Sequence, residues 1–81
     1  MTNDLRQAVK LLGAGDWKAA HAIVQDDEDS RLSCWAHAIV HVMEGDLPNA
    51  RYWYRKAGRP PFSEAPPLAG EIRALKAEIG V

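Results

Sequence analysis

The sequence predicts a small all-α protein, and three observations carry this prediction. Apolar residues recur at helical three-and-four spacing along most of the chain, no stretch alternates with period two over the length of a strand, and no Asn-Gly or Asp-Gly hairpin signal is present. The composition agrees, because 47% of the 81 residues are hydrophobic and 26% are charged, as in an ordinary globular protein. We therefore expect one helical domain over residues 1–81.

The first two helices are expected to form a hairpin. The first runs from Asp4, which is placed to cap its first turn, to Leu12, and Gly13 is placed to stop it. Gly15-Asp16 then supplies a turn and a carboxylate that can accept the free backbone donors of the second helix. The residues expected on the inner sides are Leu5, Ala8, Val9 and Leu12, followed by Trp17, Ala20 and Val24.

A second hairpin follows the acidic run Asp26–Asp29, which has no apolar residue to bury and is expected to be a solvated connection. Ser30 can cap a third helix over Arg31–Glu44. Gly45-Asp46 repeats the earlier turn chemistry and leads into a fourth helix that ends near Ala57. The apolar face of the third helix is expected to hold Leu32, Trp35, Ile39, Val42 and Met43.

The last segment is predicted to be a proline-rich loop over 59–67 and a closing helix over 68–79. Two proline pairs bracket the loop, which cannot be helical throughout. The closing helix carries an amphipathic stripe that consists of Leu68, Ile72, Leu75 and Ile79.

An internal repeat links the two hairpins. Shifting the chain by thirty residues aligns the helical patterns and the turns. Neither hairpin can bury its apolar face alone, so the two are expected to stack. The shift places Leu5 on Trp35, Ala8 on Ala38, Val9 on Ile39, Leu12 on Val42, Gly15 on Gly45, Asp16 on Asp46 and Ala20 on Ala50.

This pattern resembles the tetratricopeptide family of helical repeats. The family sets a small residue in its first helix, then an alanine and an aromatic residue four positions apart in its second. Ala38, Ala50 and Tyr54 fill these places in the second unit, with Pro60 or Pro61 near the end, and the first unit offers Ala8, Ala20 and Val24.

The resemblance implies two antiparallel helix-turn-helix repeats, at about 3–27 and 30–58, in right-handed stacking and closed by a capping helix. The thirty-residue period is shorter than the family's usual period of about 34. The family's leading tryptophan position falls on Cys34, and the large apolar positions after it fall on His37 and His41, so the register of the third helix stays open. The segment 45–58 also resembles short uncharacterised bacterial proteins, from which no activity is carried over.

Charge and cysteine content limit the classes of function. Ten basic and eleven acidic residues give a net charge of -1, so no global attraction to nucleic acid or to an anionic membrane is present. Cys34 is the single cysteine and suits a reducing compartment. Because the N-terminus carries an acid and no long apolar run, we expect a cytoplasmic protein with no membrane association.

Three histidines are the first candidates for chemistry. His37 and His41 lie four residues apart on the third helix, and His21 lies on the neighbouring second helix. Three imidazoles in this arrangement can hold zinc or a similar metal. The alternative is that each histidine is a structural residue at a helix interface. A helical wheel puts His37 and His41 opposite Trp35 and Ile39, whereas the tetratricopeptide register turns them inward against the fourth helix.

Two further functions are considered, a cysteine nucleophile and the binding of single-stranded nucleic acid. Cys34 as thiolate with His37 as base is not favoured, because a neighbour one turn away on the same helix often points parallel to it and no third orienting group is indicated. The segment 51–56 interleaves bases with aromatics, as in single-strand binders. The repeat, however, needs Trp53 and Tyr54 on the inner side of the fourth helix.

The leading interpretation is therefore a non-enzymatic helical-repeat module that binds a protein or peptide, or another copy of itself. It assigns no catalytic residue and needs no cofactor. The alternative is a small metal-binding or catalytic domain centred on His21, His37 and His41. Residues that can form a partner-binding surface, if they are exposed, are Trp35, Ile39, Val42 and Trp53.

Overall fold

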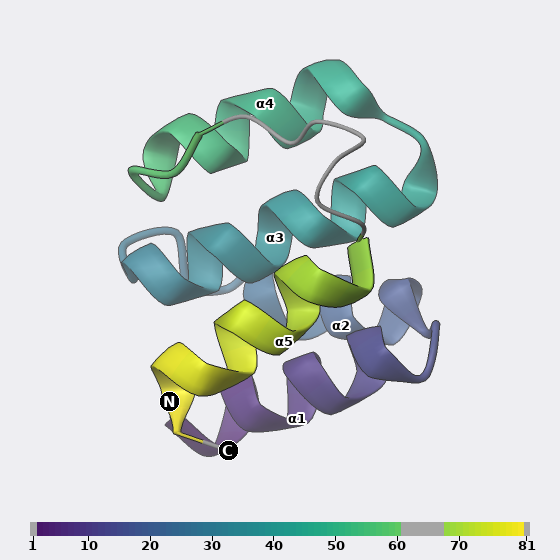
Figure 1. Ribbon diagram of the computed structural model, residues 1–81, viewed down its shortest axis with the longest axis vertical. Helices are drawn as coiled ribbons and strands as arrows, with labels where there is room; N and C mark the ends of the chain where they lie inside the picture. Colours follow the sequence, from purple (N-terminus) through teal and green to yellow (C-terminus); the bar gives the residue numbers. More distant parts are fainter. Residues whose placement is uncertain (1, 61–67, 81) are drawn as a thin grey trace.

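A computed structural model describes residues 2–60 and 68–80, and within these ranges it contains helices and no strand. The helices are α1 (Thr2–Gly13), α2 (Trp17–Val24), α3 (Arg31–Glu44), α4 (Leu47–Lys56) and α5 (Leu68–Ile79) (Figure 1). The predicted all-α class is confirmed. None of these helices has the length and hydrophobicity that a bilayer-spanning segment needs.

Helix α3 is the centre of the fold. It packs on α1, α2, α4 and α5, and among the described helices α4 packs on α3 alone. Figure 1 shows α4 along one side of α3, α1 and α2 on the other side, and α5 crossing α3 and α1. Every residue from Ser33 to His41 is buried, so no side of this part of α3 faces solvent.

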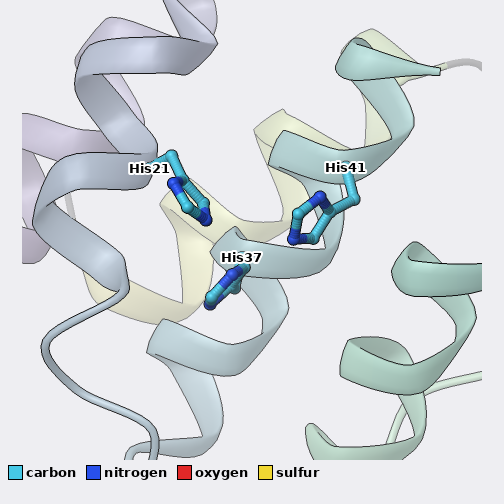
Figure 2. Close-up of side chains that lie close together, drawn as sticks. All are labelled: His21, His37 and His41. Atoms are coloured by element: carbon cyan, nitrogen blue, oxygen red, sulfur yellow. The ribbon is translucent and has the colours of Figure 1, made fainter. Parts of the chain in front are cut away.

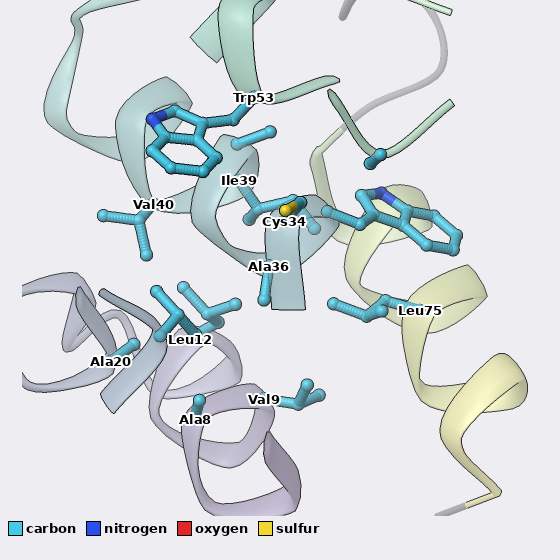
Figure 3. Close-up of a cluster of buried hydrophobic side chains, with 14 of the residues drawn as sticks. Ala8, Val9, Leu12, Ala20, Cys34, Ala36, Ile39, Val40, Trp53 and Leu75 are labelled. Atoms are coloured by element: carbon cyan, nitrogen blue, oxygen red, sulfur yellow. The ribbon is translucent and has the colours of Figure 1, made fainter. Parts of the chain in front are cut away.

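The core is formed by side chains from all the described helices around α3 (Figure 3). Burying a side chain of the size of leucine or isoleucine contributes about 1.5–3 kcal/mol, so these residues supply most of the driving force for folding. The largest fully buried side chains are Trp35, Tyr54, Leu12, Ile39 and Leu75, with Val9, Val24 and Val40 beside them.

The two predicted Gly-Asp turns have the same geometry. Gly15 and Gly45 have φ of 84° and 93°, a left-handed conformation that favours glycine. The next residue, Asp16 or Asp46, donates its N–H to the carbonyl of Leu11 or His41 at 2.9 Å, which closes the preceding helix. The same aspartates then cap the following helices through Oδ1, as predicted from their position.

Several predicted helix boundaries are exact and others are corrected. Helices α3 and α5 have the predicted bounds, and Ser30 caps α3 by accepting the N–H of Ser33. Helix α1 begins at Thr2, so Asp4 lies inside its first turn and is not its cap. It also includes Gly13, because the chain turns at Gly15. Of the predicted loop 59–67, residues 61–67 lie outside the described part of the chain.

The thirty-residue repeat is reflected in burial as well as in the turns. Three pairs of apolar residues at equivalent positions are buried in both hairpins. The equivalent buried pairs are Ala8 and Ala38, Val9 and Ile39, and Ala20 and Ala50.

The carboxylate of Glu71 links α5 to α3 and α4. Glu71 Oε1 accepts a hydrogen bond from Trp35 Nε1 at 3.2 Å and another from the Tyr54 hydroxyl at 3.0 Å. Burial and the adjacent Glu71 carboxylate raise the pKa of Tyr54, which keeps the phenol protonated as a donor. The guanidinium of Arg59 lies 3.7 Å from the centre of the Trp35 ring, a cation–π contact on the same cluster.

We predict that Glu71→Ala lowers the free energy of unfolding by about 2 kcal/mol, because it leaves two donors on buried side chains without an acceptor. Glu71→Gln retains an acceptor oxygen and is expected to lose less. The matched control is Glu78→Ala, which removes only a surface ion pair with Arg31 and is expected to change stability by less than about 0.5 kcal/mol. Urea unfolding followed by circular dichroism measures all three.

Candidate metal centre

Three imidazoles converge where α2 packs on α3. His21 comes from α2, and His37 and His41 come from successive turns of α3. One ring nitrogen of each lies within 4.8 Å of those of the other two. Figure 2 shows the three rings turned toward a common point between the two helices. This is the set of histidines that the sequence singled out.

The rings are packed against one another. The centroids of His37 and His41 are 4.9 Å apart with an interplanar angle of 26°, and His21 meets both edge-on, at 4.8 Å from His37 and 5.4 Å from His41. His37 and His41 are buried at 4% and 6% exposure, and His21 is partly exposed. The cluster is therefore closed on the α3 side and reaches solvent through His21.

Glu44 fixes the tautomer of His41. Its Oε1 lies 2.8 Å from His41 Nδ1. A carboxylate oxygen accepts hydrogen bonds, so Nδ1 is the ring nitrogen that donates to Glu44, and Nε2 is the nitrogen left for another partner. A carboxylate that holds one nitrogen of a histidine in this way is typical of metal-ligating histidines, because it orients the ring and makes the free nitrogen more basic.

His37 is the most deeply constrained member of the cluster. Its ring stacks on Trp53 of α4 with centroids 3.8 Å apart and an interplanar angle of 10°. Its Nδ1 is buried and has no hydrogen-bond partner in the described residues. Burial, then His41, His21 and Lys56, lower the pKa of His37 from 6.5 to about 4, so this imidazole is neutral at pH 7.

The arrangement has the donor set of a metal site and needs a small closure to reach ligand geometry. Tetrahedral zinc with Zn–N distances of about 2.0–2.1 Å sets its ligand nitrogens roughly 3.4 Å apart. The nitrogens here lie within 4.8 Å of one another. Side-chain rotations would therefore have to bring the three nitrogens closer together before they could share one ion.

A second set of possible metal ligands next to the cluster contains two acids that already have structural roles. His41, Glu44 and Asp46 also bring their ligand atoms within 4.8 Å of one another. Asp46 Oδ1, however, accepts the N–H of Asn49 as the cap of α4, and Glu44 Oε1 is bonded to His41. These two acids therefore support the turn and the His41 ring.

The candidate partner-binding residues are mostly interior. Trp35 and Ile39 are fully buried, Trp53 is 8% exposed, and Val42 is partly buried. Trp35 and Ile39 belong to the core, and Trp53 stacks on His37, so these three side chains offer little accessible surface. Both proposed faces of α3 are buried, with His37 between His21 of α2 and Trp53 of α4.

The other two chemistries are not supported by the surroundings of their residues. The Cys34 thiol is buried and donates to the carbonyl oxygen of Glu28 at 3.3 Å, and burial raises its pKa, so it stays protonated at neutral pH. In the segment 51–56, Trp53 and Tyr54 are buried as the repeat predicted, which leaves Tyr52 as its exposed aromatic side chain.

Sequence reasoning missed the roles of Glu44 and Trp53 at this site. The Glu44 contact was detectable, because a residue three positions after His41 lies on the same helical face. The stacking of Trp53 on His37 was not, because it depends on how α4 packs on α3.

Comparison with known proteins gives no family for this chain: no protein-family model matches it, and neither does any curated protein or solved structure. The class that the structure defines is a five-helix protein, within the described residues, with a three-histidine cluster between α2 and α3.

We predict that the metal-free protein loses about 3 kcal/mol of stability as the pH falls from 6.5 to 4. The unfolded chain protonates His37 near its ordinary pKa of 6.5, whereas the folded chain resists protonation until about pH 4. The stability is therefore present above pH 6.5 and is lost toward pH 4. Urea unfolding in the presence of a chelator at several pH values measures it.

The control for this prediction is His37→Phe, which keeps a ring against Trp53 and removes the titrating nitrogens. The fall in stability over this pH range is expected to be smaller in the variant. An equal fall in both proteins would assign the pH dependence to other groups.

Proposed function

We propose that this protein binds one divalent transition-metal ion through His21, His37 and His41. The observation that carries the proposal is that one ring nitrogen from each histidine lies within 4.8 Å of the other two, although His21 is on α2 and the other two histidines are on α3. The buried, unpartnered Nδ1 of His37 supports it independently, because a buried polar atom with no partner carries a desolvation cost that a ligand would remove.

The ligand set favours zinc. Imidazole nitrogen suits zinc, copper, nickel and iron among the common ions. Three imidazole nitrogens match the arrangement in which zinc binds three protein ligands and a water. His21 is the ligand that completes the site from the first hairpin, and it is the most exposed of the three rings.

Metal binding at this site would join the two hairpins. His21 belongs to the first hairpin and the other two ligands to the second. An ion bound to all three holds α2 against α3, and any ligand that binds only the folded chain stabilises it by mass action. In this proposal the ion strengthens the contact between the two repeats.

The peptide-binding function that the sequence favoured is less well supported at the residues chosen for it. Trp35, Ile39 and Trp53 are occupied by intramolecular contacts. Three finer parts of the sequence interpretation remain proposals. The two hairpins are tetratricopeptide-like, which the repeated turns support. The protein is bacterial, and it is cytoplasmic, which the free, buried Cys34 supports because a free thiol suits a reducing compartment.

We predict one equivalent of Zn²⁺ per chain for the wild type, and at least tenfold weaker binding for each of His21→Ala, His37→Phe and His41→Phe. Isothermal titration calorimetry of untagged protein measures affinity and stoichiometry. Because Trp53 stacks on His37, Cu²⁺ or Ni²⁺ at the site should also quench tryptophan fluorescence, and the quenching should disappear in His21→Ala.

His21→Ala is the decisive variant, since a partly exposed position tolerates truncation and the fold is expected to survive it, as circular dichroism will show. Cys34→Ala is the matched control and is expected to leave binding unchanged. Wild-type protein that binds Zn²⁺ no more tightly than His21→Ala would contradict the proposal.

We further predict that Glu44→Gln weakens Zn²⁺ binding by about 10–100-fold without changing the stoichiometry, because the carboxylate that orients His41 is lost. Glu78→Gln, which alters an exposed acid on α5, is the control and should bind as the wild type does. Equal affinities of the two variants would show that Glu44 does not act on the bound ion.

A further inference from the structure

A groove lies on the side of the molecule where α1, α2, α3 and α5 meet. Its volume is about 510 Å³, within the range of sites that bind small molecules or side chains. Its large, partly buried apolar residues are Leu5, Ile23, Leu32 and Ile79, from α1, α2, α3 and α5, and Ala22 and Val24 of α2 complete the apolar lining. The molecule therefore leaves an aliphatic surface open at this point.

The polar lining of the groove is acidic. Asp26 and Asp27, from the connection between α2 and α3, line it, and among the described residues no lysine or arginine does. Asp26 is exposed, while Asp27 also accepts backbone hydrogen bonds from Asp29 and Ser30. An occupant that matches this groove must be apolar and positively charged.

The outer face of α4 has the matching properties. Leu47 and Tyr52, at 46% and 52% exposure, are the large hydrophobic residues exposed in the described part of the chain, and both lie on α4. Arg51 and Arg55 are exposed on the same face, and α4 contains no acidic residue. Lys56 is already paired with Glu28 at 3.5 Å, so the two arginines carry the available charge.

We propose that this protein associates with a second copy of itself, with the outer face of α4 of one copy seated in the acidic apolar groove of the other. Tyr52 enters among the aliphatic residues, and Arg51 and Arg55 face the acids at the rim. Aromatic and arginine side chains are the usual anchors of such interfaces. This association does not depend on the metal site.

Two features make a second copy the occupant that fits. Within one copy the opposite face of α4 packs on α3, so the outer face turns away from the copy's own groove. The net charge of -1 means that two copies do not repel each other strongly, although each carries a basic helix and an acidic rim. Because the charges lie at the surface, the association is expected to weaken with salt.

The first test is sedimentation equilibrium of the untagged wild type over a range of concentrations up to millimolar, at low and at high NaCl. We expect association that rises with concentration and falls with salt. Arg51→Glu with Arg55→Glu is expected to raise the dissociation constant by at least about tenfold, and Asp26→Arg should have a similar effect. The matched control, Lys10→Glu with Arg73→Glu, makes the same change in net charge on exposed positions outside both surfaces.

The second test mixes the two deficient proteins. The double α4 variant keeps an intact groove, and Asp26→Arg keeps an intact α4 face, so the mixture should associate although each protein alone does not. A wild type that stays monomeric, a control variant that loses association equally, or a mixture that stays monomeric would each overturn the proposal. All samples are measured with a chelator and again with Zn²⁺, which separates this contact from any association through bound metal.

Discussion

The burial of α3 is the constraint on which the rest of this structure depends. All the other described helices pack on it, and nine consecutive residues, Ser33 to His41, have no solvent-facing side. A helix in this position must be apolar on every face, or its polar side chains must be satisfied by neighbours. The Ser33 hydroxyl donates to the Val24 carbonyl, and His41 is hydrogen-bonded to Glu44. His37 is the exception, because its buried Nδ1 has no hydrogen-bond partner among the described residues.

This constraint explains why burying the histidine cluster costs desolvation free energy and why its rings are held in fixed positions. The His37 ring is packed between His21 of α2 and Trp53 of α4, and the His41 ring packs on His21 and His37, where aliphatic side chains would add stability without a desolvation cost. Trp53 fixes one ring by stacking and Glu44 fixes the other by hydrogen bonding. Rings that are held in place before a ligand arrives lose little conformational entropy when it binds.

Much of the architecture was predictable from the sequence because it depends on local signals. Left-handed glycines followed by capping aspartates mark two turns, and the spacing of apolar residues gives α3 and α5 their bounds. The convergence of His21 with His37 followed from hairpin stacking. The positions that escaped prediction depend on tertiary packing: Glu71 bridges Trp35 and Tyr54 from α5, and Trp53 stacks on His37 from α4. No local pattern encodes those distances.

Three adjacent residues at the short turn between α3 and α4 each help to position the histidine cluster. Glu44 aligns His41, Gly45 reverses the chain, and Asp46 starts the helix that delivers Trp53 to His37. Insertion of even one residue after Gly45 would rotate α4 about its axis and move the Trp53 indole away from His37, while Glu44 would stay beside His41 on α3. The length of this connection is therefore part of the site itself, and loop grafting or circular permutation should spare it while other connections are altered.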